Sequence, residues 1–178
     1  MKIISTERLI LQEATLKDAP FILALVNSPN WLAFIGDSGI KNLADAKKYI
    51  QKSLLDCYQQ NGFGLYKVVL KTTSTPIGLC GFLKRPYLDH PDIGFATLPK
   101  YEGQGYTFEA AKATMHYGTH QLNFETILAI TTEENTKSKN LLTKLGFVAN
   151  GKVTPENSEK ELLVYTNKPT IDSSLHSE

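Results

Sequence analysis

Short apolar runs typical of β-strands alternate with longer stretches of helical periodicity along this chain, and their order constrains the fold more than any other feature. Short apolar or alternating runs predict strands, whereas apolar residues three or four positions apart predict helices. The predicted order is strand, two helices, three strands, helix, strand, helix and two strands, at residues 6–14, 15–26, 42–61, 64–70, 76–83, 92–98, 108–121, 125–131, 135–145, 147–153 and 161–166. This order favours an α/β (α+β) fold with one mixed sheet flanked by helices.

Length and composition predict one domain and argue against several classes of partner. A chain of 178 residues, 42% of them hydrophobic, can bury one core, so we predict a single domain at 1–166 and a flexible polar tail at 167–178. The 19 basic and 18 acidic residues are spread along the chain, and no basic stripe predicts nucleic-acid binding. No apolar run approaches the roughly 20 residues that span a membrane, so we expect a cytoplasmic protein. No pattern predicts the oligomeric state.

Two local signals lie in the first third of the chain. Thr15 and Asp18 have the spacing of a capping box and predict a helix start. The segment 27–37 combines proline, glycine and aromatic residues, which favours an irregular conformation. Its aromatic residues, Trp31 and Phe34, have two open interpretations, the wall of an acceptor pocket or ordinary core packing.

Cysteine and histidine spacings do not predict a metal site. The two cysteines form no C-x-x-C pair, and Cys80 lies in an apolar run where burial as a small hydrophobic residue is expected. His116 and His120 are four apart on a predicted helix, as in some metal sites. The glutamate of the H-E-x-x-H motif is absent, however, and Gly118 weakens the helix between them.

The chemistry-bearing stretch is "EGQGYT", which joins the strand at 92–98 to the helix at 108–121. Free N–H groups and the helix dipole make a helix N-terminus favourable for anions, and Gly103 and Gly105 let the backbone approach a phosphate closely. The same two glycines also suit a simple tight turn. The spacing fits neither the Walker motif nor the dinucleotide fingerprint.

The stretch "GFATLPKYEGQGYTFEA" resembles the acyl-CoA loop of the GNAT N-acetyltransferases, whose pattern is Q/R-x-x-G-x-G/A after a strand. Glu102 and Thr107 occupy the first and last positions and depart from that pattern. The later block "TTEENTKSKNLLTKLGF" resembles a second segment of the same family. In that segment an Asn follows a strand, a Ser or Ala comes three residues later, and the helix ends in Gly-Phe. The beginning, "TERLILQEATLKDA", is similar to the ribosomal-protein-alanine acetyltransferase branch.

The resemblance implies an N-acetyltransferase domain whose sheet splays in the middle to receive acetyl-CoA as co-substrate. It implies that Asn135 bonds the pantetheine near the thiol and that Ser138 lies beside it. It also implies that the strand before the loop bonds the pantetheine through main-chain groups of Phe95, Ala96 and Thr97. The loop amides would hold the diphosphate, and they belong to Gly103, Gln104, Gly105, Tyr106 and Thr107.

The two departures have physical consequences. Thr107 keeps its N–H, but its branched side chain needs more room than Gly or Ala. A carboxylate at Glu102 repels a diphosphate by about 1 kcal/mol at exposed distances of a few ångströms. We expect Lys100 and Lys112 to offset this charge, the affinity for coenzyme A to be weakened, and Glu102→Gln or Glu102→Arg to restore it.

Acetyl transfer to an amine requires the neutral amine. At pH 7 an α-amine of pKa near 8 costs about 1.4 kcal/mol to deprotonate, and a lysine near 10.4 costs about 4.6 kcal/mol. Asp92 is the first candidate for the base, acting through a water, and a solvated strand-end carboxylate is the other interpretation. His90 is the alternative base or a plain surface histidine.

The leaving thiolate needs little help from an acid. The general-acid tyrosine of many GNAT enzymes corresponds to Leu142, but a thiol of pKa near 8.5 leaves readily as thiolate. Ser138 either stabilises the leaving sulfur or is an ordinary helix-surface residue. We therefore predict direct acetyl transfer from acetyl-CoA to a primary amine, either a protein N-terminus or a small molecule. The rival hypotheses are a non-catalytic acyl-CoA sensor and a nucleotide-phosphate binder.

Overall fold

The computed structural model describes residues 1–168 and contains one eight-stranded sheet in the order β1-β2-β3-β4-β5-β6-β8-β7. Neighbouring strands are antiparallel except for the parallel pair β5 and β6. The strands are β1 (Lys2–Ser5), β2 (Leu9–Gln12), β3 (Leu65–Leu70), β4 (Pro76–Leu83), β5 (Asp92–Thr97), β6 (Leu128–Thr131), β7 (Val148–Val153) and β8 (Leu162–Thr166). The predicted mixed sheet is thereby confirmed.

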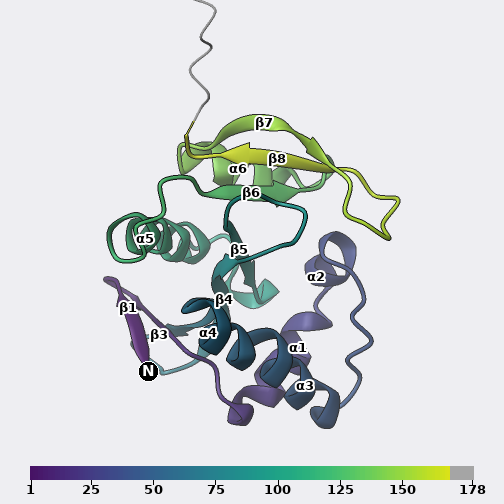
Figure 1. Cartoon of the computed structure of the whole chain (residues 1–178). Coiled ribbons are helices and arrows are strands. Elements are labelled where there is room, and N and C mark those ends of the chain that lie inside the picture. The colour runs from purple at the N-terminus through teal and green to yellow at the C-terminus, as the bar shows by residue number, and fades with distance from the viewer. Residues whose placement is uncertain (169–178) are drawn as a thin grey trace, which may run out of the picture.

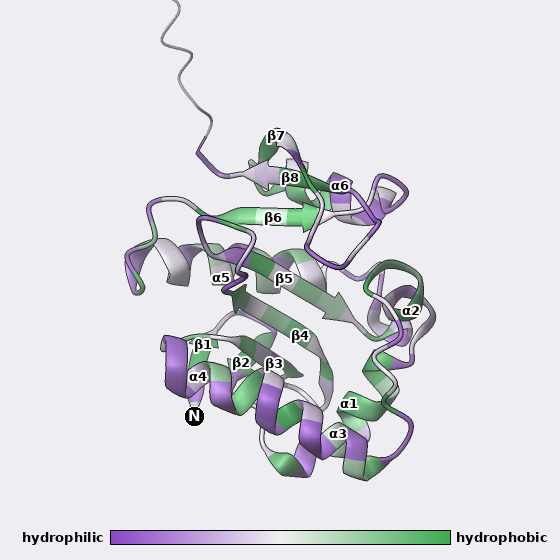
Figure 2. Ribbon diagram, turned by 45° about the vertical axis from the view of Figure 1, so that its right-hand side comes forward, coloured by the Kyte–Doolittle hydropathy of each residue, from purple (hydrophilic) through white to green (hydrophobic). Residues whose placement is uncertain are grey.

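Helices cover the sheet, and Figure 1 shows α1, α3 and α4 grouped on one side and α5 on another. The α-helices described are α1 (Ala19–Val26), α2 (Pro29–Phe34), α3 (Leu43–Tyr49), α4 (Asp56–Asn61), α5 (Tyr106–His120) and α6 (Thr136–Lys144). A π-helical segment, Ile50–Leu55, joins α3 to α4, and short 3₁₀ turns occupy Leu16–Asp18 and Pro99–Tyr101. Figure 2 shows hydrophilic and hydrophobic residues alternating around α3 and α4, as expected of helices that cover a sheet.

Successive side chains of the central strands pack into separate cores on the two faces of the sheet. Phe82 joins the cluster that contains Leu9 and Leu11 of β2. Leu79 joins the second cluster, with Ile22 and other residues from the helices of the first third of the chain. Both clusters are closed to solvent, so the sheet is a rigid base for the residues at its edges.

The structure corrects three predictions about local elements. The strand β1 precedes the predicted first strand and pairs with β2. The segment 27–37 is not irregular throughout, because α2 begins after Ser28 and Pro29 occupies its first turn with a preset φ. The helix predicted at 42–61 is interrupted by the π-helical segment.

Most of the predicted C-terminal tail, residues 167–178, lies outside the described residues. Residues 169–178 are not described, so the structure does not test the tail there. Asn167, however, is bound to the domain: its Oδ1 accepts from the Ile127 N–H at 2.8 Å, and its own N–H donates to the Ile127 carbonyl at 3.1 Å. The ordered domain therefore extends past Thr166.

The sheet opens between its two parallel strands. β5 pairs with β4 at six positions, but with β6 only at Asp92 and Leu128. Figure 2 shows β5 and β6 diverging from that point. The predicted splay is thus present, and it leaves main-chain groups of β5 without a partner strand.

Candidate active site

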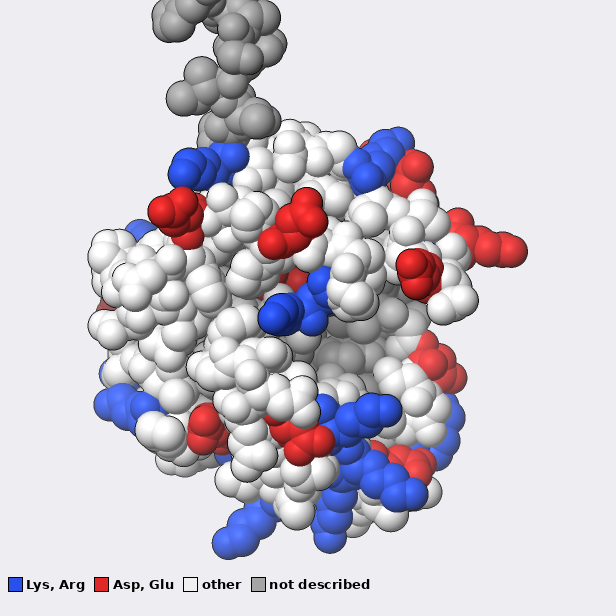
Figure 3. Space-filling view, in the orientation of Figure 1, with Lys and Arg blue, Asp and Glu red and all other residues white. Residues whose placement is uncertain are grey.

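A cavity of about 830 Å³ occupies the opening between β5 and β6. Its wall combines residues from both strands, from α2, from the loop before α5 and from the first two turns of α6. Of the residues predicted from the sequence, the wall contains Asp92, Phe95, Ala96, Thr97, Gly103, Thr107, Asn135 and Ser138. Gln104, Gly105 and Tyr106 are outside the wall, at the start of α5. In Figure 3, acidic and basic side chains are interspersed over this face of the molecule.

The main-chain direction of β5 separates the three predicted pantetheine contacts. Leu98 N–H donates to the Ile77 carbonyl of β4, whereas the Pro91 carbonyl accepts from Leu128 N–H at the start of β6. Because main-chain groups alternate in direction along a strand, Phe95 and Thr97 direct theirs into the opening. Ala96 is turned toward β4 and contributes to the cavity wall without a free main-chain group on that side.

Left-handed backbone at both glycines shapes the loop before α5. Gly103 has φ of +73° and Gly105, the N-cap of α5, has φ of +81°. The Arg8 guanidinium lies against this turn: Nη1 donates to the Gln104 carbonyl at 3.0 Å, and the group stacks 4.3 Å from the Tyr106 ring centroid. This contact was not predicted from the sequence, where the segment around Arg8 is similar to a family opening and gives no sign of a partner in the loop.

Glu109, in the first turn of α5, holds Arg8 in place. Its Oε2 accepts from Arg8 Nε at 2.6 Å, while Oε1 accepts from the Arg8 N–H and from the Thr6 hydroxyl. Partial burial raises the pKa of Glu109, but these three donors outweigh it and the pKa lies below its ordinary value. The start of the chain thereby braces the glycine loop.

Gly105→Ala is expected to raise KM for acetyl-CoA about tenfold. A Cβ here would lie 3.3 Å from Arg8 Nη2 and would displace the guanidinium that braces the loop, beyond the about 1–2 kcal/mol that an L-residue costs in the left-handed region. Gly103→Ala is the matched control, because its φ is as unfavourable but nothing lies within 4 Å of its Cβ position. Steady-state kinetics with varied acetyl-CoA provide the measurement, and equal KM values for the two variants would contradict a role for the Arg8 contact.

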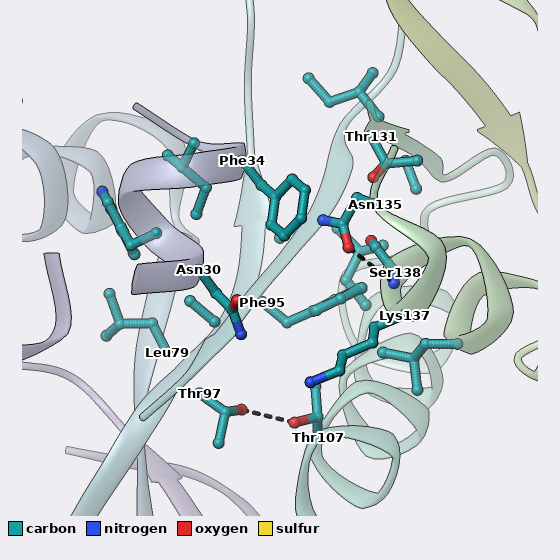
Figure 4. A pocket seen from close by; sticks show the side chains of 18 of the residues that line it. Asn30, Phe34, Leu79, Phe95, Thr97, Thr107, Thr131, Asn135, Lys137 and Ser138 are labelled. Atoms are coloured by element: carbon teal, nitrogen blue, oxygen red, sulfur yellow. Dashed lines mark hydrogen bonds between the residues drawn. The ribbon is translucent and has the colours of Figure 1, made fainter. Parts of the chain in front are cut away.

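Thr107 fits the loop because its hydroxyl has a partner. Its Oγ1 lies 2.6 Å from the Thr97 Oγ1, a hydrogen bond that joins the first turn of α5 to the last residue of β5 (Figure 4). The branched side chain therefore ties the two edges of the cavity together where the family pattern has Gly or Ala.

Glu102 also has partners, but they differ from those expected. Asn30 Nδ2 of α2 donates to its Oε1 at 2.6 Å, and Lys137 Nζ of α6 lies 3.1 Å from its Oε2. Lys100 instead lies over the Tyr101 ring, and Lys112 is not among the side-chain contacts of Glu102, which are to Asn30 and Lys137. The expected compensation by Lys100 and Lys112 is therefore wrong, and Lys137 provides the charge.

Asn135 and Ser138 lie together at the start of α6 (Figure 4). Asn135 is the N-cap of the helix, and its Oδ1 accepts from the Ser138 N–H at 3.2 Å. The cap uses the carbonyl of the side chain and leaves the amide NH₂ as a donor on the cavity wall. Leu142, one turn beyond Ser138, is buried on the same wall.

Asp92 is buried and paired, so the interpretation as a solvated strand-end carboxylate is wrong. Its side chain is 1% exposed, and both carboxylate oxygens lie 3.0 Å from Arg85 Nε. Burial raises the pKa of Asp92 to about 6, although the charge and hydrogen bonds of Arg85 oppose the shift. Arg85 was missed from the sequence. His90 is exposed and outside the cavity wall.

An aromatic group forms the other end of the wall. Trp31 is buried and packs edge-on against Tyr49, with ring centroids 6.5 Å apart. Burial raises the pKa of Tyr49 to about 12, so its hydroxyl is a neutral donor at pH 7. Trp31 and Phe34 both line the cavity, and Trp31 is also part of the core. Core packing is thus confirmed for Trp31, and a role of the pair in acceptor binding stays a prediction.

The two predicted histidines of α5 pack against each other. The His116 and His120 rings stack with centroids 4.0 Å apart, and His120 Nδ1 lies within hydrogen-bond distance of the Thr119 hydroxyl and the His116 carbonyl. Within residues 1–168, no cluster of three or more His, Cys, Asp or Glu side chains has the geometry to hold a metal ion. Cys80 is buried, as predicted, and contacts the Thr114 hydroxyl.

Comparison with known proteins identifies the class that this fold and cavity define. Residues 8–148 match the family model described as an acetyltransferase (GNAT) domain, so the chain belongs to this family. It is 29% identical to the uncharacterized N-acetyltransferase YnaD of Bacillus subtilis over 83% of this chain and 84% of that protein. It is 28% identical to the uncharacterized N-acetyltransferase p20 of Bacillus licheniformis, over 85% of each chain.

Solved structures agree with this assignment. The GNAT-family acetyltransferase of Bacillus anthracis is 26% identical, with a TM-score of 0.76 over 92% of this chain and 96% of that one. A RimL ribosomal L7/L12 α-N-protein acetyltransferase in complex with coenzyme A shares the fold at 15% identity and a TM-score of 0.75, over 93% and 97% of the two chains. The chain is an acetyl-CoA-dependent N-acetyltransferase that moves an acetyl group to an amine. The rival sensor hypothesis is not favoured. None of the described helices has the length and apolar character required to span a membrane.

Proposed function

We propose that the acceptor is an α-amino group, either the N-terminus of a protein or the amine of a small molecule, and that acetyl transfer is direct. Asp92 carries the proposal, because it is a buried carboxylate on the cavity wall with a pKa raised to about 6. It takes the acceptor proton through a water, since Arg85 covers both of its oxygens. The predicted cytoplasmic location remains a prediction.

A base of this strength suits an α-amine better than a lysine. Moving a proton from an amine of pKa near 8 to a carboxylate of pKa about 6 costs about 3 kcal/mol. The same transfer from a lysine near 10.4 costs about 6 kcal/mol. The difference corresponds to more than a hundredfold in rate, and because the pKa of Asp92 cancels from it, the preference for an α-amine comes from the lower pKa of that amine.

The remaining wall residues hold the cofactor. Main-chain groups of Phe95 and Thr97 bond the pantetheine, and the free amide of Asn135 bonds it closer to the thiol. The diphosphate lies against the amides of residues 103–107 at the start of α5, where the helix dipole favours an anion. The Ser138 hydroxyl donates to the leaving sulfur. This suffices without an acid at Leu142, because a thiol of pKa near 8.5 leaves readily as thiolate.

A thiol-release assay at pH 7 tests the acceptor class. We expect kcat/KM for peptides with a free N-terminus, or for amino acid amides, to be about 100-fold higher than for peptides that have a blocked N-terminus and a free lysine side chain. The difference in amine deprotonation predicts this ratio. Comparison of peptides with small amines of the same terminal residue then separates protein from small-molecule acceptors. A preference for lysine would contradict the proposal, and cofactor binding without turnover on any amine would restore the sensor hypothesis.

A further inference from the structure

Lys137 places an ammonium group over the cofactor side of the cavity. It lies in the first turn of α6, and Figure 4 shows its side chain extending across the cavity toward Thr107 and Thr97. Its side chain is 81% exposed, so nothing but its ionic contact restrains it. The loop pattern places Gln or Arg at position 102, close to this ammonium, but here Glu102 occupies that position.

Glu102 orients the ammonium without binding it strongly. The two groups are 3.1 Å apart and Glu102 is 25% exposed, and an exposed pair of this kind contributes about 0–1 kcal/mol. Asn30 of α2 bonds the other Glu102 oxygen at 2.6 Å, so the carboxylate stays in place when the lysine leaves it. The ammonium can therefore exchange partners at little cost.

The other cations near the cavity already have local partners. Arg85 is bound to the buried Asp92. Lys144 lies 4.1 Å from the centroid of the Phe108 ring. Arg8, behind the loop, is paired with Glu109. Among the described residues of this wall, Lys137 is the cation held by an exposed ion pair, 3.1 Å from Glu102.

We propose that Lys137 binds the diphosphate of acetyl-CoA, supplying from α6 the interaction that the Gln or Arg of the loop pattern would make, and that Glu102 holds the ammonium over the site until the cofactor arrives. The proposal depends on the placement of the diphosphate at residues 103–107 given above. A diphosphate offers more negative charge and more acceptor oxygens than one carboxylate, so it takes the ammonium from Glu102. Glu102 then remains bound to Asn30.

Calorimetric titration of Lys137→Gln with three probes tests the proposal. Coenzyme A has the diphosphate and the 3′-phosphate, dephospho-coenzyme A keeps only the diphosphate, and pantetheine has neither. We expect Lys137→Gln to weaken coenzyme A and dephospho-coenzyme A by the same factor, about tenfold, and to leave pantetheine unchanged. Lys139→Gln is the matched control, because Lys139 lies on the same helix and pairs with Glu133 instead.

Each other result has a definite meaning. Equal affinities in Lys137→Gln and Lys139→Gln would overturn the proposal. A loss confined to coenzyme A would also overturn it, because it would assign Lys137 to the 3′-phosphate. If the unaltered enzyme bound pantetheine as tightly as coenzyme A, the placement of the diphosphate at this loop would fail, separately from the role of Lys137.

The Glu102 contact is tested by a double-mutant cycle. Glu102→Gln removes both the repulsion of the phosphates and the competition for Lys137, so we expect about threefold tighter coenzyme A binding. In the Lys137→Gln background the gain is expected to be smaller, because only the repulsion remains to be removed. An additive cycle would show that Glu102 does not compete for the ammonium and would overturn that part of the proposal.

Discussion

Asp92→Asn is expected to lower kcat about 100-fold while the protein stays folded. Removing a general base typically costs about 10²–10⁴ in rate, and the lower value is expected because an α-amine is deprotonated in part by water. Asn keeps the size of Asp92, and its carbonyl can still accept from Arg85 Nε, which now bonds both oxygens. Thiol-release kinetics and a circular dichroism spectrum provide the measurement.

The pH profile separates a base from a residue that only supports the structure. Asp92 acts as the carboxylate, so its contribution is lost as the pH falls through its pKa of about 6. When Asp92 takes its proton from the bound ammonium, whose pKa is near 8, log(kcat/KM) rises with slope 1 below about pH 6, is level between about pH 6 and 8, and falls above about pH 8. In Asp92→Asn only the neutral amine reacts, so the slope is 1 up to about pH 8 with no break near pH 6. A profile of unchanged shape would exclude Asp92 as the base.

His90→Gln is the control for the competing base. His90 is exposed and outside the cavity wall, so we expect unaltered kcat and an unaltered profile. A loss of rate in His90→Gln with normal rate in Asp92→Asn would reverse the assignment.

The sequence predicted the strands that form the centre of the sheet because they are long and strongly apolar. The runs at 64–70, 76–83 and 92–98 correspond closely to β3, β4 and β5. The shorter β1 was missed because it has four residues and depends on β2 for its hydrogen bonds. The helix α2 was missed because its six residues bury only Trp31, which is too short a pattern to show helical periodicity.

The candidate site shows the same division between local and distant information. Gly103 and Gly105 were predicted because both the strand before them and the helix after them are adjacent in sequence. The partners of Glu102 come from α2 and α6, 72 and 35 residues away, and Arg8 meets Gln104 across 96 residues. Such pairs arise only when the sheet brings the elements together. Neither periodicity nor spacing within one element contains that information.

The largest effect on stability is expected for Gly81→Ala, by about 3 kcal/mol. A Cβ at Gly81 would lie 2.0 Å from the Gly64 carbonyl oxygen and 2.9 Å from the Leu65 Cα. These are backbone atoms of the segment leading into β3, and Phe82 N–H donates to the same carbonyl. The strands must therefore separate, which combines the upper range of overpacking costs, about 1–3 kcal/mol, with weakened hydrogen bonding.

Thermal unfolding followed by circular dichroism measures this effect, and Gly94→Ala is its control. Gly94 lies directly opposite Gly81 in the β4–β5 register, yet its Cβ would meet only the ends of the Leu83 and Leu65 side chains, at 3.2 and 3.3 Å. Those side chains can move, so we expect a Tm loss of about 10 °C for Gly81→Ala and less than a third of that for Gly94→Ala, at about 2–4 °C per kcal/mol. Equal losses would show that the approach of β3 to β4 is not rigid. Because β4 also pairs with β5 at six positions, a shift of β4 would be passed on to the strand that forms one edge of the cavity.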